Sequence, residues 1–455
     1  MGLARELKRL FGGERMSKPR DGITGGDAAL LELLDLPLLL QEGKAADTAA
    51  GRVGARDRAR RRLESAIVWR EAARRTADAA HLRKAAATAE AAALMFQEGR
   101  RMDAWARARC EQAYCALLGA ELFGDSGLNA AAEVAFKEAR TRVRGGLTAP
   151  LADLGLAIVR ARNEMALGDA EEARKAAARF AAPIAAFDIL ARRETLGRVM
   201  AAEARLVRAD ILCGWGARLQ DADLLKAAVD DAAAAARRVD VTYEPLTFAR
   251  AETLRAQALV MWGEVTADLD AISAAATTAA EVLDRLSRDD SPLDWARAQL
   301  ALGQALQTLG EAALDERSYE QAVTAYDRAN LVLKDAPAAA LRAQCAAARA
   351  LCLARSAELT GDLAVLDAAE AAMKIELSDM NARRDPVAWA LAQLHLARLY
   401  EARVEITGKD RGRLAAASLA LEMARDVFAE QGQRSLTLLA NDALDRIQGV
   451  PRTAV

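Results

Sequence analysis

Histidine, proline and aromatic residues are scarce in this chain of 455 residues, which has 2 histidines, 9 prolines and 4% aromatics. With so few histidines, and with no two of its five cysteines spaced as CxxC, it offers no familiar set of zinc ligands. Alternating runs of β-branched residues are rare too, which argues against a sheet. We therefore expect an all-α protein with no metal site and no cofactor.

The chain also lacks a strong net charge and the common catalytic motifs. Its formal net charge is −2, and outside residues 52–75 no basic stripe and no separate helix-turn-helix unit stands out. A Walker loop, a Gly-x-Ser-x-Gly turn and an HExxH helix are all missing. The sequence therefore favours neither a nucleic-acid partner nor an enzyme.

No stretch reaches the roughly 18–20 uncharged apolar residues that a membrane-spanning helix needs. The longest candidate, AALLELLDLPLLL at 28–40, is interrupted by Glu32, Asp35 and Pro37, and no small-residue cleavage signal precedes it. An odd number of cysteines without a pairing pattern fits a reducing compartment. We expect a cytoplasmic protein.

What the chain has in abundance is alanine, arranged in repeats. Short motifs that end in an aromatic residue recur as MDAW at 102–105, PLTF at 245–248, PLDW at 292–295 and PVAW at 386–389. The last two are 94 residues apart, which is twice 47, and PLTF lies 47 residues before PLDW. ALRAQCAAARAL at 340–351 matches the residues after PLDW at a spacing of 45, which aligns Arg342 with Arg297.

A second alanine-rich helix follows each of these motifs after turn residues such as Gly310, Gly361 and Gly408. One such pair cannot bury its apolar stripes alone, so neighbouring pairs are expected to stack into a continuous core. The sequence predicts an N-terminal arm at 1–51 and about eight helix pairs at 52–431. It also predicts a C-terminal capping helix and tail at 432–455.

The best-preserved unit carries a family resemblance. LALGQAL at 300–306 and SYEQAVTAYDRANLVL at 318–333 resemble the tetratricopeptide repeat in their small and aromatic positions. Two features depart from that family: Gln299 stands where its Trp is expected, and the connection from Gly310 to Tyr319 is seven residues longer. The resemblance covers about 380 residues and implies a right-handed α-solenoid of TPR-like repeats. Its concave groove would bind a peptide or protein.

In such repeats, residues that flank the buried positions of the first helix line the groove. One position reads Arg107, Arg250, Arg297 and Arg342, and the next reads Gln304, Arg349 and Arg398. An arginine ladder can grip carboxylates in bidentate fashion. The alternative is that these arginines pair with acids of adjacent helices, such as Glu252 or Asp294.

The same helical register predicts where three tryptophans and three cysteines lie. Trp105, Trp295 and Trp389 are expected to pack between repeats, because their even spacing is what a repeating interface requires. Cys110, Cys345 and Cys352 fall on the groove side, which predicts partial exposure.

The N-terminal arm raises several open alternatives. MGLARELKRLFGG places Leu3, Leu7, Leu10 and Phe11 on one face of a short basic helix. Residues 1–12 could lie peripherally on the inner face of a membrane, dock on a partner, or simply fold back on the solenoid or fray. Residues 13–27 and 41–51 are interpreted as flexible linkers. The leucine-rich stretch 29–40 between them either caps the first repeat or is recognised by another protein.

A basic cluster follows the arm. Residues 52–75 contain nine arginines against three acidic residues, a charge of +6. The cluster is either a solvated helix face or a docking patch for an acidic surface or anionic lipid.

Taken together, these features predict a non-catalytic interaction scaffold that binds a partner protein or peptide in its groove. The alternative is a regulatory or sensor module that binds a small peptide or ligand there, with the N-terminus as a membrane or partner anchor.

Overall fold

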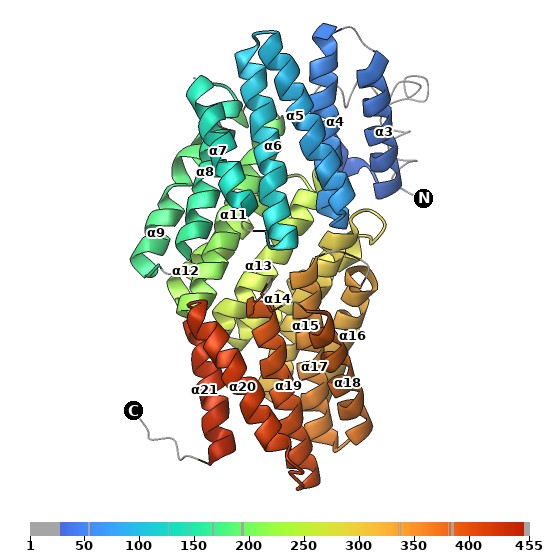
Figure 1. The fold of residues 1–455 in the computed structure, drawn as a ribbon, viewed down its shortest axis with the longest axis vertical. Coiled ribbons are helices and arrows are strands. Elements are labelled where there is room, and N and C mark those ends of the chain that lie inside the picture. Colours follow the sequence, from blue (N-terminus) through green and yellow to red (C-terminus); the bar gives the residue numbers. More distant parts are fainter. Residues whose placement is uncertain are drawn as a thin grey trace.

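The computed structural model describes residues 28–449 apart from 53–54, 126, 144, 166–167, 193–194, 335, 337, 381 and 384–385. Every regular element within these residues is a helix (Figure 1). The chain starts with a 3₁₀ helix, η1 (Ala28–Leu33), and with α3 (Leu36–Arg52). It ends with α21 (Arg434–Gln448), which packs on the preceding helix.

Between these ends the described helices form eight successive pairs. The first four are α4 (Ala55–Thr76) with α5 (Ala79–Glu98), α6 (Met102–Phe123) with α7 (Gly127–Arg142), α8 (Thr148–Met165) with α9 (Ala170–Ala178) and α10 (Ala181–Leu190), and α11 (Thr195–Leu219) with α12 (Ala222–Ala236). The others are α13 (Pro245–Thr266) with α14 (Leu269–Arg285), α15 (Pro292–Ala313) with α16 (Glu316–Leu333), α17 (Ala339–Thr360) with α18 (Leu363–Asp379), and α19 (Pro386–Thr407) with α20 (Arg413–Glu430). The predicted all-α solenoid of about eight helix pairs with a C-terminal capping helix is confirmed.

The turn inside each unit repeats in detail. The residue just after the first helix has a positive φ at Ala77, Gly124, Gln220, Ala267, Leu314, Gly361 and Gly408. In five of these turns the next residue is an aspartate whose side chain caps the second helix: Asp78, Asp221, Asp268, Asp315 and Asp362. The prediction of Gly310 as a turn residue is wrong. It lies inside α15, where an added Cβ would come within 3.3 Å of the Tyr319 ring.

The first helices of the last four units begin at Pro245, Pro292, Ala339 and Pro386, which are 47 residues apart. The spacing of 45 proposed for 340–351 is therefore wrong. In the helical register Arg342 takes the place of Trp295 and Trp389, and Gln344 takes the place of Arg297.

The core between units is built largely from alanine, which lets helices approach closely. Ala256, Gly303 and Ala350 share one register position in successive first helices. Ala256 and Ala350 are buried, and at Gly303 a Cβ would come within 2.6 Å of Tyr326. Trp295 packs on the cluster containing Leu246 and Val282, between its own helix and the preceding unit, as predicted.

The N-terminal arm differs from its prediction. Residues 41–51 are not a linker, because they belong to α3, which packs along α4. Asp47 of α3 accepts hydrogen bonds from Ser65 Oγ at 2.5 Å and from Trp69 Nε1 at 3.2 Å. Gly43 is packed so closely that a Cβ would lie 2.8 Å from the Trp69 ring.

The superhelix brings distant units together. In Figure 1 the N-terminal helices form an upper tier and the C-terminal helices a lower one. α4 contacts α15, and α6 contacts α17. The short helix η1 contacts α4, α11 and α13, so this part of the leucine-rich stretch lies inside the solenoid. The rest of the stretch, from Leu36, belongs to α3, which packs on α4 of the first unit, as expected of a cap on the first repeat.

Candidate functional site

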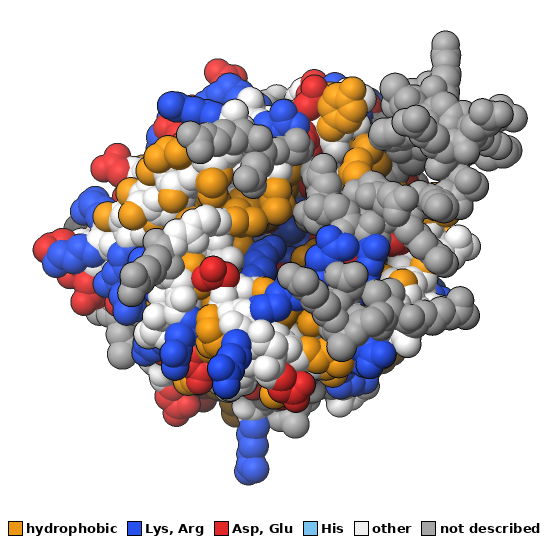
Figure 2. All heavy atoms as spheres, turned by 90° about the horizontal axis from the view of Figure 1, so that it is seen from above, with side chains coloured by type: hydrophobic (Ala, Val, Ile, Leu, Met, Phe, Trp, Pro, Cys, Tyr) orange, Lys and Arg blue, Asp and Glu red, His pale blue; other side chains and the backbone are white. Residues whose placement is uncertain are grey.

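The inner faces of the first helices surround two adjoining cavities. The inner cavity has a volume of about 180 Å³ and is lined by α4, α6, α8, α11 and α13 together with Leu31 and Glu32 of η1. The outer cavity, about 370 Å³, is formed mainly by α11, α13, α15 and α17. Seen along the long axis, the molecule has a hollow with Lys or Arg side chains in its depth beside a hydrophobic wall (Figure 2). The side chains that line both cavities are Arg74, Glu121, Arg162, Glu203, Val207 and Arg250.

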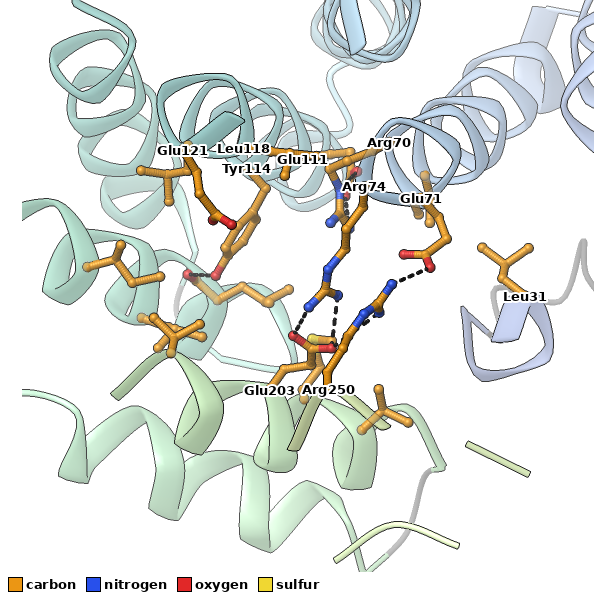
Figure 3. A pocket seen from close by; sticks show the side chains of 18 of the residues that line it. Leu31, Arg70, Glu71, Arg74, Glu111, Tyr114, Leu118, Glu121, Glu203 and Arg250 are labelled. Atoms are coloured by element: carbon orange, nitrogen blue, oxygen red, sulfur yellow. Dashed lines mark hydrogen bonds and ion pairs between the residues drawn. The ribbon is translucent and has the colours of Figure 1, made fainter. Parts of the chain in front are cut away.

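A network of ion pairs lies between the two cavities (Figure 3). Arg74 of α4 donates two hydrogen bonds of 2.9 Å to the carboxylate of Glu203 in α11. Arg250 of α13 donates to Asp294 Oδ2 at 2.8 Å and to Glu71 Oε1 at 3.1 Å. Bidentate and charge-assisted hydrogen bonds of this kind are strong and directional, so they hold four first helices in a defined arrangement.

The arginines set the charge state of the network. Burial alone would raise the pKa of Glu71, but Arg250, Arg75 and Arg74 beside it hold that pKa well below its usual range. Burial opposes ionisation of Asp294 too, and Arg250 nevertheless lowers its pKa. These carboxylates therefore stay ionised near neutral pH.

Three arginines of the basic cluster at 52–75 belong to this interior. Arg75 is fully buried, while Arg70 and Arg74 are each 24% exposed. Arg70 pairs with Glu111 of α6, and Arg75 pairs with Glu71 one turn earlier. For these three residues neither a solvated face nor a surface docking patch is correct, because acidic residues of neighbouring helices neutralise Arg70 and Arg74, and Glu71 of the same helix neutralises Arg75.

Of the predicted groove residues, four reach the cavities. Arg107 lines the inner cavity, Arg297 and Gln304 line the outer one, and Arg250 lines both. Arg250 is only 8% exposed and its charge is taken up by Glu71, Glu203 and Asp294. Arg297 pairs with Glu121 of α6 at 2.9 Å. A role of these arginines in binding an acidic ligand stays a hypothesis. The contacts of Arg250 and Arg297 are ion pairs with acidic residues of other helices, which is the alternative given in the sequence analysis.

The other three predicted arginines line neither cavity and pair with acids of adjacent helices. Arg342 contacts Glu376 of α18 at 3.3 Å, and Arg349 contacts Asp327 of α16 at 2.5 Å. Arg398 is surrounded by Glu358, Glu401 and Glu405.

Sequence reasoning missed three polar residues that line the outer cavity: Asp210, Gln257 and Gln344. Asp210, Gln257 and Gln304 recur at intervals of 47 residues, so the spacing of the repeat was a signal that could have identified them. The side chains of Asp210, Gln257, Gln304 and Gln344 form no hydrogen bond or ion pair within the described part of the chain. Beside them the cavity has apolar side chains, among them Leu254, Met261 and Leu341.

The cysteines are not exposed to the groove, contrary to expectation. All five are buried, and Cys110, Cys345 and Cys352 are at most 1% exposed. Cys345 and Cys352 stand 47 residues after Ala298 and Ala305, so they fill small-residue positions between helices. Burial raises the pKa of Cys110 and of Cys345 to about 12, which leaves these thiols protonated and poor nucleophiles.

The remaining expectations concern membranes and metals. The proposed anchor residues Leu3, Leu7, Leu10 and Phe11 lie outside the described residues. Among the described helices none is long and apolar enough to cross a bilayer. No group of three or more His, Cys, Asp or Glu side chains in the described ranges is arranged to hold a metal ion.

Comparison with known proteins adds two structural similarities. No family model matches the chain, and no curated protein matches it. A crystal structure of Rap protein complexed with competence and sporulation factor aligns with a TM-score of 0.45 and 13% identity, over 85% of this chain and 98% of that one. The crystal structure of the P58(IPK) TPR domain aligns with a TM-score of 0.21 and 16% identity, over 92% and 99%. At these values the similarity says nothing about what this chain binds.

Proposed function

We propose that this protein is a non-catalytic interaction module that binds a partner peptide, or a peptide segment of a partner protein, in the outer cavity. One observation carries the proposal: Asp210, Gln257, Gln304 and Gln344, whose side chains form no hydrogen bond or ion pair with a described residue, converge on this cavity from four successive first helices. A glutamine amide both donates and accepts hydrogen bonds, as a peptide group does, so a row of amides suits an extended backbone.

The size and lining of the cavity support this proposal. A volume of about 370 Å³ lies within the usual range of roughly 300–1,000 Å³ for ligand sites. Leu254, Met261 and Leu341 offer apolar surface next to the amides, and a methionine adapts to differently shaped side chains.

A selection experiment tests the proposal. A displayed library of random peptides is selected on the full-length protein, and enriched peptides are measured by fluorescence anisotropy. The double variant Gln257→Ala and Gln304→Ala should weaken binding tenfold or more, since each lost hydrogen bond costs about 1 kcal/mol. The matched control, Gln321→Ala with Asn330→Ala, changes exposed amides on α16 and should bind as the wild type does. Selection of no peptide, or equal loss in both double variants, would refute groove binding.

A sensor is the second candidate function, and one observation favours it. Leu31 and Glu32 of η1 line the inner cavity, which shares six side chains with the outer one. A ligand in the groove would therefore sit close to the end of the N-terminal arm. In this version residues 1–12 would anchor the protein to a membrane or partner. Co-sedimentation with anionic vesicles, with and without residues 1–13, tests the membrane version, and equal pelleting would exclude it.

A further inference from the structure

Three carboxylates without a cationic partner follow the groove faces of α11, α13 and α15: Asp210, Glu264 and Glu311, here called the acidic strip. Glu264 comes seven residues after Gln257 and Glu311 seven after Gln304, which is about two helical turns, so each points to the same side as its glutamine. Glu264 accepts a hydrogen bond of 2.8 Å from Thr308 of α15, and Glu311 accepts one of 3.1 Å from Gln307. All three are exposed, and none is in an ion pair with a described residue.

A buried hydrogen-bond acceptor at the outer cavity also lacks a donor among the described residues. Asp294 is 2% exposed, lines the outer cavity, and uses Oδ2 to accept hydrogen bonds from Arg250 and Ser291. Its Oδ1 atom has no hydrogen-bond partner among the described residues. An unsatisfied buried acceptor costs roughly 1–3 kcal/mol, which a donor group of a ligand would recover.

The cations of the outer cavity are already neutralised. Arg74, Arg162, Arg250 and Arg297 line it, and each has an acidic partner within the protein. Arg107 has no ion-pair partner among the described residues, but it lines the inner cavity and not the outer one. Arg162 and Arg297 share the single carboxylate of Glu121, and Asp210 lies near enough to both to balance them, so the four arginines and four acidic residues that line the cavity cancel. The carboxylates beyond this balance are Glu264 and Glu311 of the acidic strip, which continue along α13 and α15 past the cavity lining.

We propose that the peptide bound in the outer cavity is basic: a lysine or arginine side chain reaches past the cavity lining to the acidic strip and lies beside Glu264 and Glu311, which have no cationic partner among the described residues. The neighbouring apolar side chain of the peptide rests on Leu254, Met261 and Leu341, and its backbone meets Gln257 and Gln304. This inference rests on the proposed function, because it specifies the chemistry of the peptide that the groove takes.

The surroundings of the strip agree with this ligand. The helices around the exposed carboxylate of Asp210 displace part of its hydration water, and this desolvation, with the neighbouring charge of Glu121, raises its pKa, although Arg162 and Arg297 oppose that rise. Desolvation and the charge of Glu311 likewise raise the pKa of Glu264, against the hydrogen bond from Thr308. Carboxylates held in this way are destabilised in their charged form, and an incoming ammonium or guanidinium group relieves the repulsion.

The test compares peptides that differ only in charge. Three fluorescein-labelled, amidated peptides are used, built of Lys-Leu-Ser, Gln-Leu-Ser or Glu-Leu-Ser triplets, and each is titrated with the full-length protein. A groove variant carries Asp210→Asn, Glu264→Gln and Glu311→Gln. The matched control carries Asp270→Asn, Glu281→Gln and Glu320→Gln, which remove the same charge from exposed positions on the second helices α14 and α16. Circular dichroism confirms that both variants remain helical.

We expect the lysine peptide to bind the wild type and the control equally, and the groove variant at least tenfold more weakly, with an effect that shrinks at high salt. Equal weakening in both variants would mean diffuse attraction to the whole surface and would overturn the proposal. Preference for the glutamate or glutamine peptide would overturn the basic ligand while leaving peptide binding intact. Binding of none of the three peptides would contradict the basic ligand, and an unproductive library selection would then reject the proposed function as well.

Discussion

Arg250 of α13 and Glu71 of α4 are joined by a hydrogen bond of 3.1 Å although 179 residues separate them in the chain. The same guanidinium contacts Asp294 of α15 and lies 3.9 Å from Glu203 of α11. One buried cation therefore meets carboxylates from the first, fourth and sixth helix pairs, and its own helix belongs to the fifth. Arg250 therefore links helices of distant units, so its replacement should lower the stability of the fold.

Replacement of Arg250 by Ala should destabilise the fold. It leaves Glu71 and Asp294 buried with fewer cations, a change that typically costs about 3–5 kcal/mol. Urea unfolding followed by circular dichroism measures the loss. Arg342→Ala is the control, because Arg342 is 30% exposed and its pairing with Glu376 should be worth no more than about 1 kcal/mol. Equal stability of the two variants would contradict a structural role for Arg250.

Arg75 should hold η1 inside the solenoid. Its guanidinium donates hydrogen bonds of 2.7 Å to the carbonyls of Leu31 and Leu34 and one of 3.2 Å to that of Asp290, before α15. In Arg75→Met these carbonyls lose their donor, so we expect faster amide exchange and proteolysis at residues 28–35. Arg60→Met on the same helix is the control, since Arg60 is 51% exposed. Unchanged protection of η1 in Arg75→Met would exclude this role.

Glu32 should make stability depend on pH near neutrality. Its carboxylate accepts hydrogen bonds from Thr247 N at 2.8 Å and Thr247 Oγ1 at 2.5 Å, at the start of α13. Burial raises its pKa from 4.5 to about 7, although Arg250 and these hydrogen bonds oppose the shift. The folded state therefore binds a proton more tightly than the unfolded state. The resulting stabilisation is complete below pH 4.5 and is lost as the pH rises through 7.

The variant Glu32→Gln carries no ionisable group there, and its amide can still accept from Thr247 N. Its free energy of unfolding relative to wild type should increase between pH 5 and pH 8 by up to about 3 kcal/mol. Denaturant titrations at several pH values measure this difference. Parallel profiles for the two proteins would show that Glu32 ionises as freely in the folded state as in the unfolded one.

The thiols should be unreactive in the native protein. All five cysteines are buried, and burial raises the pKa of Cys110 and of Cys345 to about 12. We expect almost no reaction with a thiol reagent at pH 8 until denaturant is added, because only unfolding exposes the thiolate. Absorbance after addition of dithionitrobenzoate measures this directly. Rapid labelling of Cys345 or Cys352 without denaturant would instead support the groove exposure that the sequence suggested.

The helix pairs could be predicted because their signals are local. Alanine content, apolar periodicity and prolines before the first helices each act within a few turns, and their recurrence near 47 residues revealed the stacking. The error at 340–351 arose because ALRAQC resembles WARAQL two residues out of register. The aspartate caps would have prevented it, since Asp315 and Asp362 are 47 residues apart.

The site was predicted less well than the fold. Arg250, Arg297 and Gln304 line the outer cavity, a position that follows from the helical period, while their part in binding a partner stays a prediction. Whether an arginine there is free or paired could not be predicted. The partners lie 129 residues away for Arg74 and 176 for Arg297; for Arg250, Glu71 is 179 residues away, whereas Asp294, at 44 residues, was among the acids that the sequence had offered.

The amino-acid sequence by itself determined the helices, their pairing and the 47-residue repeat, because capping, propensity and short-range packing depend on neighbours in the chain. Only the tertiary structure decided which charges remain available. In the folded superhelix α4 contacts α13 and α15. Because arginines and acidic residues buried there have lost their hydration, they form ion pairs with one another. Asp210, Glu264 and Glu311 form no ion pair with a described residue, and on that ground we propose a positively charged partner for a groove that looked basic in sequence.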